Sequence, residues 1–289
     1  MTTIGIVGLG IMGGAIARNL LAAGMSVRGY DIDAARLDAL KPNGIATKSA
    51  GDAAQGADVV LTSLPSIEAL DDTVAHLLAA KVPGLVVAEL STLPIAVKEK
   101  ARAALAGGGV ILLDCPLSGT GAQAVTRDLV VYASGERAAY EKVEPVFRGF
   151  ARASHYLGAF GNGSKMKFIA NLLVAVHNVA SAEAMVLGMK AGLDPATIVK
   201  VIASGAGTSR VFELRAPLMA TRDYAPTMKI DIWQKDMAII AEFARGLGVT
   251  LPTFAASAPL YDAAQAAGLG GDDTAAVAEI IAAQAGLKR

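Results

Sequence analysis

A lysine and two asparagines occupy one stripe of an otherwise apolar stretch. Residues 161–184 read GNGSKMKFIANLLVAVHNVASAEA, and this pattern predicts a helix. Lys167, Asn171 and Asn178 are spaced by four and then seven residues, so they share one helical face. Burial in an apolar cleft lowers the pKa of a lysine toward neutrality, where the amine can accept and return a proton. The stripe therefore carries a candidate general acid/base with an amide one turn away.

A glycine-rich turn near the N-terminus predicts a cofactor site. Residues 4–20 read IGIVGLGIMGGAIARNL, in which a strand-like run is followed by a helix. The first glycine of such a turn permits the tight bend, the second lets the backbone approach a pyrophosphate, and the third allows close packing of helix on strand. We predict a dinucleotide site here, and the alternative is a structural turn on a cofactor-free α/β fold. The residues of the turn are Gly8, Leu9, Gly10, Ile11, Met12 and Gly13.

An acidic residue after the second strand-like run indicates which dinucleotide is preferred. Asp31 ends the run RGYD and stands 18 residues after Gly13, close to the spacing expected for a ribose partner. Its carboxylate can accept hydrogen bonds from the ribose hydroxyls, and its charge repels a 2′-phosphate. Ile32 and Asp33 supply no cation, which leaves Arg36 as the nearby candidate to hold a phosphate. We therefore predict a preference for NAD, with NADP as the alternative cofactor.

Hydride transfer between a nicotinamide and a hydroxyl carbon also requires a proton to leave or return. Lys167, beside Met166, Phe168 and Ile169, is the candidate group for this task. Asn171, one turn along, can bind the same oxygen or hold the lysine in place. The alternative is a lysine at the start of a helix that projects into solvent.

The elements that carry these residues fall into two groups. Up to about residue 157, seven β-branched runs alternate with helix-like segments, which is typical of a parallel sheet covered by helices on both faces. The runs are TIGIVG, SVRGYD, ADVVLTSL, GLVVAELS, GVILLDCP, DLVVYASG and ASHYLG. Beyond about residue 163 only helical periodicity is present, at 165–191, 195–203, 212–221, 229–246, 252–267 and 273–285.

This division predicts two domains. An α/β Rossmann-type dinucleotide-binding domain is expected at 1–162. An all-α domain for substrate binding and oligomerisation, beginning with a long interdomain helix, is expected at 163–289. A chain of 289 residues, 53% of them apolar and 18% charged, can build two sizeable cores.

Charge and cysteine content exclude several classes of function. Lys+Arg and Asp+Glu both number 26, so no global field favours nucleic acid. The one cysteine, Cys115, lies in the apolar run VILLDCP, which predicts a buried structural thiol, no internal disulfide and a reducing compartment. No cluster of His, Cys and carboxylate residues has metal-ligand spacing, so no metal is predicted.

The most apolar long stretch is predicted to be a soluble helix. Residues 168–188 include Asn171, His177, Asn178 and Glu183, which would be expensive at membrane depth. The N-terminus lacks a basic leader. We expect a cytoplasmic protein that binds neither membranes nor nucleic acid, with Asn178 as a buried interdomain hydrogen-bonding residue.

Five stretches keep the order of a known family's motifs. They are GLGIMGGAIARNL (8–20), LSTLP (90–94), DCPLSGTGA (114–122), GNGSKMKFIAN (161–171) and QKDMAII (234–240). Together they resemble the β-hydroxyacid dehydrogenases, the group of 3-hydroxyisobutyrate dehydrogenase and tartronate semialdehyde reductase. The resemblance spans nearly the whole chain. It implies an NAD(P)-dependent oxidoreductase that acts on a small β-hydroxyacid or the matching semialdehyde or ketoacid.

The resemblance also implies a substrate site. Ser118, Gly119 and Thr120 follow a strand-like run, and small residues there can present backbone N–H groups and a hydroxyl to a carboxylate. An ordinary Gly-rich turn is the alternative. By resemblance this loop holds the substrate carboxylate, Lys167 is catalytic and Asn171 positions the substrate.

The cofactor side of the site is expected at two other loops. Leu64 and Pro65 end the third long strand-like run and are predicted to border the cofactor. By resemblance, Ser91 and Thr92 lie on the cofactor side as well. Lys235 belongs to a lysine–aspartate pair that is commonly just surface, but the resemblance implies that it reaches both cofactor and substrate.

Two other functions fit the glycine turn. Imine reductases on this scaffold typically carry another residue at the lysine position, and some non-catalytic dinucleotide-binding relatives lose the lysine. Lys167 therefore favours a dehydrogenase over both. Segment 204–215 is expected to line the far side of the pocket. The apolar C-terminal helices and the resemblance both imply a homodimer or homotetramer.

Overall fold

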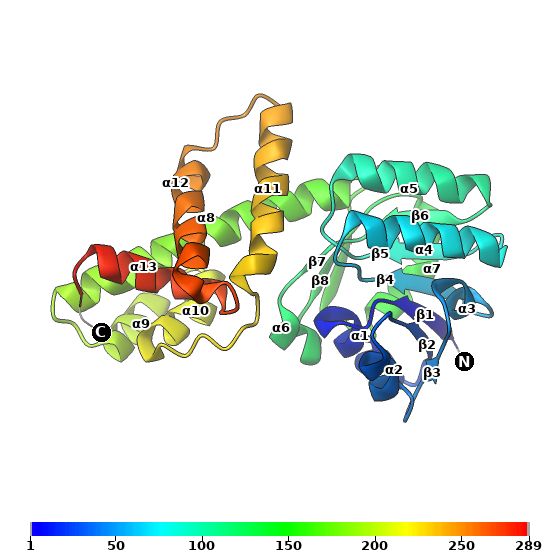
Figure 1. The fold of residues 1–289 in the computed structure, drawn as a ribbon, viewed down its shortest axis with the longest axis horizontal. Helices are drawn as coiled ribbons and strands as arrows, with labels where there is room; N and C mark the ends of the chain where they lie inside the picture. The colour runs from blue at the N-terminus through cyan, green and yellow to red at the C-terminus, as the bar shows by residue number, and fades with distance from the viewer. Residues whose placement is uncertain (1, 288–289) are drawn as a thin grey trace. The chain divides into compact units, whose positions relative to one another are not determined.

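The computed structural model describes residues 2–287. The chain forms two compact units, residues 1–167 and residues 168–289. The first unit contains strands and helices, and the second contains helices only in its described part (Figure 1). An α/β unit followed by a helical one confirms the predicted fold class.

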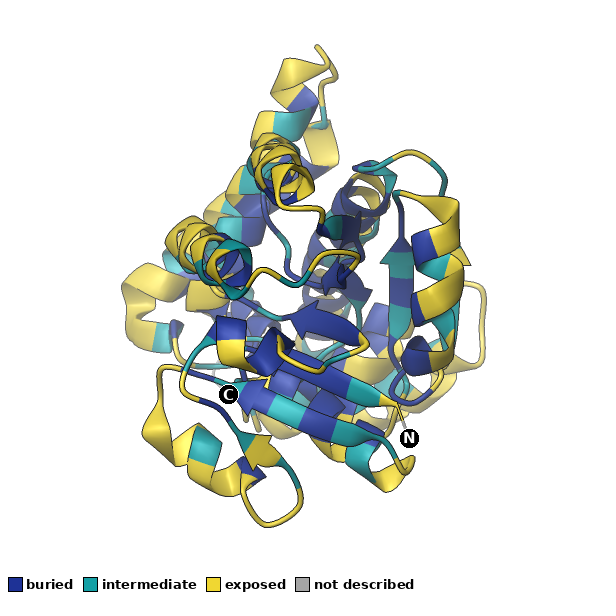
Figure 2. Cartoon of the chain, turned by 90° about the vertical axis from the view of Figure 1, so that its right-hand side faces the viewer, coloured by how far each residue is buried: buried dark blue, intermediate teal, exposed yellow. Residues whose placement is uncertain are grey.

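A six-stranded parallel sheet forms the centre of the first unit. Its strands are β1 (Thr3–Val7), β2 (Ser26–Tyr30), β3 (Ile45–Ala46), β4 (Val59–Thr62), β5 (Val86–Glu89) and β6 (Ile111–Asp114), in the order β3-β2-β1-β4-β5-β6. Strands β4 and β5 are buried along their whole length, as expected for a parallel sheet covered on both faces (Figure 2). The strand order reverses between β1 and β4. Ligands of such sheets bind outside the carboxyl ends of the strands at this point.

Helices cover both faces of the sheet. They are α1 (Ile11–Ala22), α2 (Ala34–Leu40), α3 (Ala50–Ala54), α4 (Ile67–Ala80), α5 (Ile95–Gly107), α6 (Gly121–Val125) and α7 (Arg137–Phe147). Alternate residues of a strand point to opposite faces, so Ile4 and Ile6 of β1 join a core with α1 and α7. Val7 of the same strand joins a second core with α4 and α5. Ser49 and Ser66 cap α3 and α4 by accepting backbone N–H groups.

Two of the seven predicted runs do not join the main sheet. Strands β8 (Val130–Ala133) and β9 (Ala153–Tyr156) form a separate three-stranded sheet with β7 (Leu117–Ser118). Strand β7 is antiparallel to β8, and β8 is parallel to β9. The expectation of one parallel sheet is wrong here, because the short helix α6 returns the chain beside β7 without a crossover to the next parallel position. A bridge between Asp114 and Ser134 connects β6 to the end of β8.

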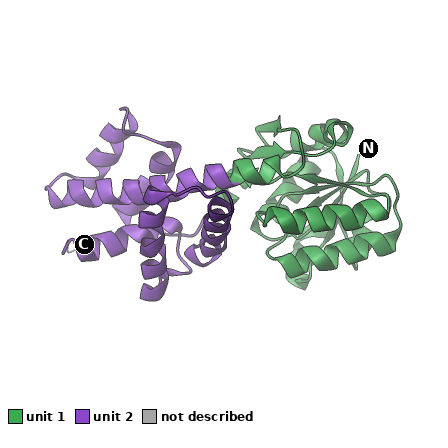
Figure 3. Cartoon of the chain, turned by 90° about the horizontal axis from the view of Figure 1, so that it is seen from above, with its two compact units in different colours: residues 1–167 green, residues 168–289 purple. Residues whose placement is uncertain are grey.

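The predicted helices beyond residue 163 are confirmed (Figure 3). They are α8 (Asn162–Lys190), α9 (Pro195–Ala203), α10 (Arg210–Thr221), α11 (Ile230–Gly246), α12 (Pro252–Ala264) and α13 (Val277–Gln284). Helix α8 begins in the first unit and continues into the second, and the helices after it lie in the second unit. A π-helical turn, η1 (Gln265–Leu269), follows α12, and a 3₁₀ turn, η2 (Thr274–Ala276), precedes α13. Helices α9 and α10 begin at Asp194 and Ser209, whose side chains accept N–H groups of the first turn.

Helix α8 is long and apolar enough to cross a membrane by length and composition alone. Asn178, however, has hydrogen-bond partners inside the second unit. Asn178, fully buried, donates to the Tyr261 hydroxyl at 3.0 Å and to the Thr274 carbonyl at 2.8 Å. These bonds are typical of a core helix. Asn178 is a buried hydrogen-bonding residue as predicted, but both of these partners belong to its own unit.

Candidate active site

The predicted glycine turn joins β1 to α1 at the point where the strand order reverses. Gly8 has φ +89°, and a Cβ there would collide with the carbonyl oxygen of Ser63. A Cβ at Gly13 would collide with the carbonyl oxygen of Gly8. Gly10, the N-cap of α1, is not crowded in this way, since a Cβ there would make only an ordinary contact, 3.5 Å from Arg36 Nη1. The first and last glycines are thus required by packing, and the middle one leaves room beside the helix N-terminus for a phosphate group.

Asp31 follows β2 and is bonded to the glycine turn. Its Oδ2 accepts the N–H of Leu9 at 2.6 Å, and its Oδ1 accepts the N–H of Asp33 at 2.9 Å. Arg36 lies 3.3 Å from Asp31 Oδ2 and 3.3 Å from Asp33 Oδ2. Two carboxylates therefore face one guanidinium at the place where a 2′-phosphate would need a cation.

The ends of β4 and β5 meet beside the turn. The N–H of Leu64 donates to Ser91 Oγ at 2.8 Å, and both residues are buried. Pro65 is exposed and Thr92 is half-buried. The two predicted cofactor-side loops are therefore neighbours at the carboxyl edge of the sheet.

The predicted substrate loop rests on the glycine turn. A Cβ at Gly121 would collide with the side chain of Ile11, and Asn19 Nδ2 of α1 donates to the carbonyl of Ala124 at 2.7 Å. Gly119 has φ +126°, which favours glycine. The two predicted binding segments are thus in contact within the first unit.

The N–H group of Thr120 already has an internal partner. Thr120 and Gln123 form a capping box at the start of α6, in which Thr120 N–H donates to Gln123 Oε1 at 3.0 Å. Gln123 Nε2 in turn lies 3.3 Å from Asp128 Oδ2. The groups of this loop best suited to a carboxylate are therefore the Ser118 hydroxyl and the N–H of Gly119.

Lys167 lies in the second turn of α8 and is 7% exposed. Asn171 follows one turn later, 5% exposed, and its Nδ2 donates to Asp236 Oδ2 at 2.8 Å. Asp236 was not among the predicted site residues, although it adjoins Lys235 in the motif QKD. Lys235 Nζ lies 3.9 Å from Asp236 Oδ1. The sequence signal that could have found Asp236 is Asn171, because an asparagine in a buried stripe needs a hydrogen-bond acceptor.

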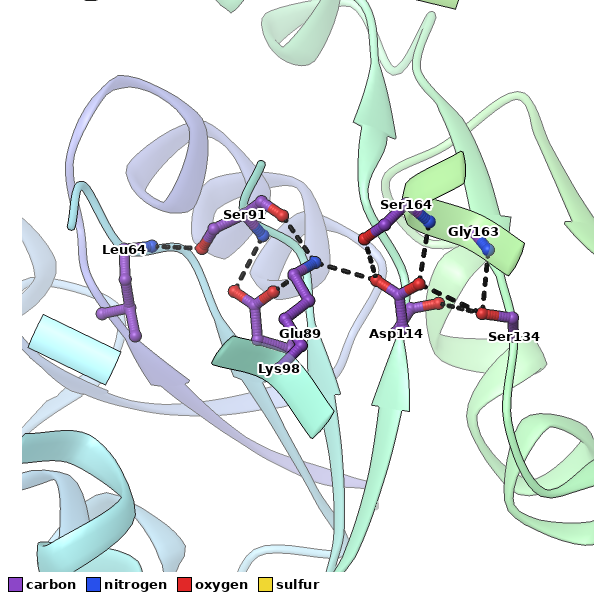
Figure 4. Close-up of polar contacts among 8 residues, drawn as sticks. All are labelled: Leu64, Glu89, Ser91, Lys98, Asp114, Ser134, Gly163 and Ser164. Carbon is purple, nitrogen blue, oxygen red and sulfur yellow. Dashed lines mark hydrogen bonds and ion pairs between the residues drawn. The ribbon is translucent and has the colours of Figure 1, made fainter. Parts of the chain in front are cut away.

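The structure also contains a buried ionic cluster of Lys98, Glu89 and Asp114 that the sequence did not predict (Figure 4). Lys98 Nζ lies 2.6 Å from Glu89 Oε2 and 2.8 Å from Asp114 Oδ1, and all three side chains are at most 1% exposed. Burial opposes the charged form of Lys98, but the two carboxylates outweigh it and raise the pKa of this lysine above its usual value.

Cys115 next to this cluster is a structural residue, as predicted. It is fully buried, and burial, followed by the charge of Asp114, raises the pKa of the thiol well above its usual value. A thiol kept protonated in this way is a poor nucleophile. Within residues 2–287 no group of three or more His, Cys, Asp or Glu residues could hold a metal ion.

The fold and these contacts define a class of protein. A glycine turn at the switch point of a parallel sheet, with an acidic residue after the second strand and a helical unit following, is the architecture of a nicotinamide dinucleotide-dependent oxidoreductase.

Comparison with known proteins narrows the class. The family model described as the NAD binding domain of 6-phosphogluconate dehydrogenase matches residues 3–158. The one described as the NAD-binding domain of NADP-dependent 3-hydroxyisobutyrate dehydrogenase matches residues 161–281. An L-threonate dehydrogenase of Cupriavidus necator is 36% identical, with 96% of this chain and 95% of that protein covered. The chain belongs to the β-hydroxyacid dehydrogenase family and is an NAD(P)-dependent dehydrogenase of small β-hydroxyacids.

Other relatives and solved structures support the same family assignment. An NAD-dependent L-serine dehydrogenase of Pseudomonas aeruginosa is 33% identical over 90% of this chain and 91% of its own. The crystal structure of 3-hydroxyisobutyrate dehydrogenase from Salmonella typhimurium superposes with a TM-score of 0.88 at 32% identity, covering 97% of this chain and all of that one. An imine reductase of Streptomyces aurantiacus, 20% identical with a TM-score of 0.67, shares the fold.

Proposed function

We propose that Lys167 is the general acid/base of this dehydrogenase. The observation that carries the proposal is a lysine almost removed from solvent on the helix that starts from the α/β unit. The bound nicotinamide would accept the hydride from the hydroxyl carbon, or supply it in the reverse direction. Lys167 Nζ would take the hydroxyl proton during oxidation and return it during reduction. Asn171 would position the substrate oxygen, and its bond to Asp236 fixes the orientation of its amide.

The carboxylate of the substrate would bind at the loop 118–120. Ser118 offers a hydroxyl, Gly119 offers an N–H, and Thr120 shapes the turn through its capping box. Because L-threonate and L-serine dehydrogenases are among the relatives, we propose a small polar β-hydroxyacid as the substrate class. Lys235 would contribute a positive charge to the cofactor and substrate.

The preferred cofactor would be NAD. Residues 8–13 would hold the pyrophosphate, with Leu64, Pro65, Ser91 and Thr92 along its edge. The two negative charges of Asp31 and Asp33 exceed the one positive charge of Arg36, so a 2′-phosphate would meet net negative charge. NADP would bind more weakly.

The protein would act as a homodimer or homotetramer in the cytoplasm. Large apolar side chains are exposed on the helical unit, among them Leu187 at 72% and Val201 at 60%. Large exposed apolar patches mark association sites, and these side chains are the candidates for such a patch. The buried reduced thiol of Cys115 suits a reducing compartment.

Replacing Lys167 tests the proposal directly. We expect Lys167→Met to lower kcat by about 10²–10⁴-fold, the usual contribution of an acid–base group. NAD affinity should stay near normal because the glycine turn is unchanged. The measurement is steady-state turnover on a panel of L-threonate, L-serine and 3-hydroxyisobutyrate, with the NAD Kd by fluorescence titration.

Lys165→Met is the matched control. Lys165 lies two residues earlier on α8, is exposed, and pairs with Asn162 at 3.1 Å. It should keep normal turnover. Wild-type turnover by Lys167→Met on the best substrate would remove Lys167 from the mechanism.

A further inference from the structure

The buried cluster around Lys98 connects the ends of four strands, helix α5 and the first turn of α8, all within the first unit (Figure 4). Glu89 ends β5, Asp114 ends β6, and Lys98 reaches them from α5. Lys98 Nζ also donates to the carbonyl of Ser91 at 2.7 Å, and Glu89 Oε1 accepts the N–H of Ser91 at 2.9 Å. Ser91 Oγ in turn accepts the N–H of Leu64 beyond β4. One lysine thus fixes the cofactor-side loops.

The other end of the cluster fixes the first turn of α8. Asp114 Oδ2 accepts the N–H of Ser164 at 2.8 Å, and Asp114 Oδ1 accepts its hydroxyl at 2.8 Å. Ser134, after β8, donates to Asp114 Oδ2 at 3.2 Å and accepts the N–H of Gly163 at 2.9 Å. The carboxylate also lies at a helix N-terminus, where negative charge is favourable.

The helix start is close-packed as well as hydrogen-bonded. A Cβ at Gly163 would collide with the carbonyl of Tyr132 and would lie 2.7 Å from the carbonyl of Asp114. Only glycine lets α8 approach the strands so closely. Lys167 lies three and four residues after Ser164 and Gly163, on the same face of the helix.

We infer that Asp114, held by Lys98, is a positioning residue for catalysis. It fixes the first turn of α8 against the strand ends and thereby sets where Lys167 stands relative to the cofactor-side loops. The inference rests on the proposed role of Lys167. A buried ion pair adds little net stability, because desolvation offsets the attraction, so a role in geometry accounts for the cluster better than a role in stability.

Two variants loosen the helix start to different degrees. Ser164→Ala removes one bond to Asp114 and leaves the backbone bond intact. Asp114→Asn keeps the shape, but its amide nitrogen must face either the Lys98 ammonium or the Ser164 N–H, so one contact is lost in either orientation. Ser154→Ala is the matched control, since it removes a serine hydroxyl that bonds Tyr140 at 3.0 Å elsewhere in the same unit.

The expected result is a loss of turnover without loss of cofactor binding. Ser164→Ala should lower kcat about tenfold, the effect of one charge-assisted hydrogen bond. Asp114→Asn should lower it further, with the NAD Kd within about twofold of wild type. In the Lys167→Met background, Ser164→Ala should have no further effect on kcat, because the group that it positions is gone. Ser154→Ala should keep wild-type kcat.

Three outcomes would overturn the inference. One is a lower Tm for Ser164→Ala with unchanged kcat, which would make the cluster structural only. Another is a tenfold loss that persists in the Lys167→Met background, which would show that the cluster acts elsewhere. If Lys167→Met itself keeps full turnover, the proposed function fails first and the inference fails with it. If Asp114→Asn does not fold, Ser164→Ala decides alone.

Discussion

At the scale of single residues, Asp31 holds the glycine turn and, in the proposed function, also binds the cofactor. One oxygen accepts the N–H of Leu9 inside the glycine turn, and the other accepts the N–H of Asp33. The same carboxylate engages Arg36. The carboxylate therefore helps to hold the turn. It also pairs with Arg36, the cation that the 2′-phosphate of NADP would require.

We expect Asp31→Asn to weaken NAD binding by about 10–100-fold, since charge-assisted hydrogen bonds are worth about 1.5–3 kcal/mol. The ratio of NAD to NADP affinity should fall because Arg36 loses a partner and the repelling charge is removed. Titration of both cofactors measures this. Asp38→Asn, which breaks an exposed pair with Lys41 on α2, is the control and should change neither affinity. Tighter binding of NADP than NAD by the wild type would contradict the assignment.

Ser118 is the residue on which carboxylate recognition is expected to depend. Ser118→Ala should lower kcat/KM for the acid substrate by about tenfold or more, and kcat should fall along with the rise in KM because the carboxylate also orients the reacting carbon. The amide analogue of the substrate should be poor with the wild type and little changed by the substitution. Thr126→Ala, at the exposed end of α6, is the control. Equal use of acid and amide by the wild type would refute the carboxylate site.

At the scale of elements, one buried aspartate fastens the 3₁₀ turn η2 to its neighbours. Asp273 Oδ1 accepts the N–H of Ala275 and pairs with Arg215 of α10 at 3.3 Å. Its Oδ2 accepts the hydroxyl and N–H of Thr227 and the N–H of Met228. Burial opposes ionisation, but Arg215 and these hydrogen bonds outweigh it and lower the pKa of Asp273.

A carboxyl group whose pKa is lowered on folding stabilises the folded protein. This stability is fully present above the pKa of the unfolded chain, about 3.9, and is lost as the pH falls through the pKa of the folded protein. Asp273→Asn should therefore lower the free energy of unfolding by about 3–5 kcal/mol at pH 7, because Arg215 is left unpaired. It should also flatten the decline in stability below about pH 4. Urea unfolding at a series of pH values tests both effects. Asp272→Asn, next to it, should behave as wild type, and an equally steep acid decline in Asp273→Asn would rule out this linkage.

The sequence predicted most of the elements because their signals are local. Helix periodicity located α8 to α13 within a few residues, and the run TIGIVG followed by GLG located β1 and the turn. The partners of buried polar groups were not local. Lys98 lies in AVKEKARAALAG, which looks like a solvated helix, and Glu89 and Asp114 are far from it in sequence. The antiparallel return of β7 was missed because it consists of two residues, Leu117 and Ser118.

At the scale of the whole molecule, association should be measurable. We expect light scattering to give two or four times the monomer mass, because apolar side chains such as Leu187 are exposed on the helical unit. Leu187→Lys should shift the mass toward the monomer. Lys200→Glu on α9 changes charge without removing apolar surface and is the control. A monomer for the wild type at micromolar concentration would contradict the expected homo-oligomer.

The contact of Gly121 with Ile11 bears on attempts to redirect this enzyme to new substrates. In a library of the proposed substrate loop, any side chain at position 121 would require the exposed Ile11 side chain of the glycine turn to move, because a Cβ there would collide with Ile11 Cγ2. Position 163 would be less tolerant, since a methyl group there meets the backbone carbonyls of Tyr132 and Asp114, which cannot move aside as a side chain can. Gln123 is also constrained, because its Oε1 accepts the N–H of Thr120 while its Nε2 faces Asp128 Oδ2, so a glutamate there would set two carboxylates against each other. The usable sequence space of the loop is thus set by how closely it lies against the nucleotide-binding turn.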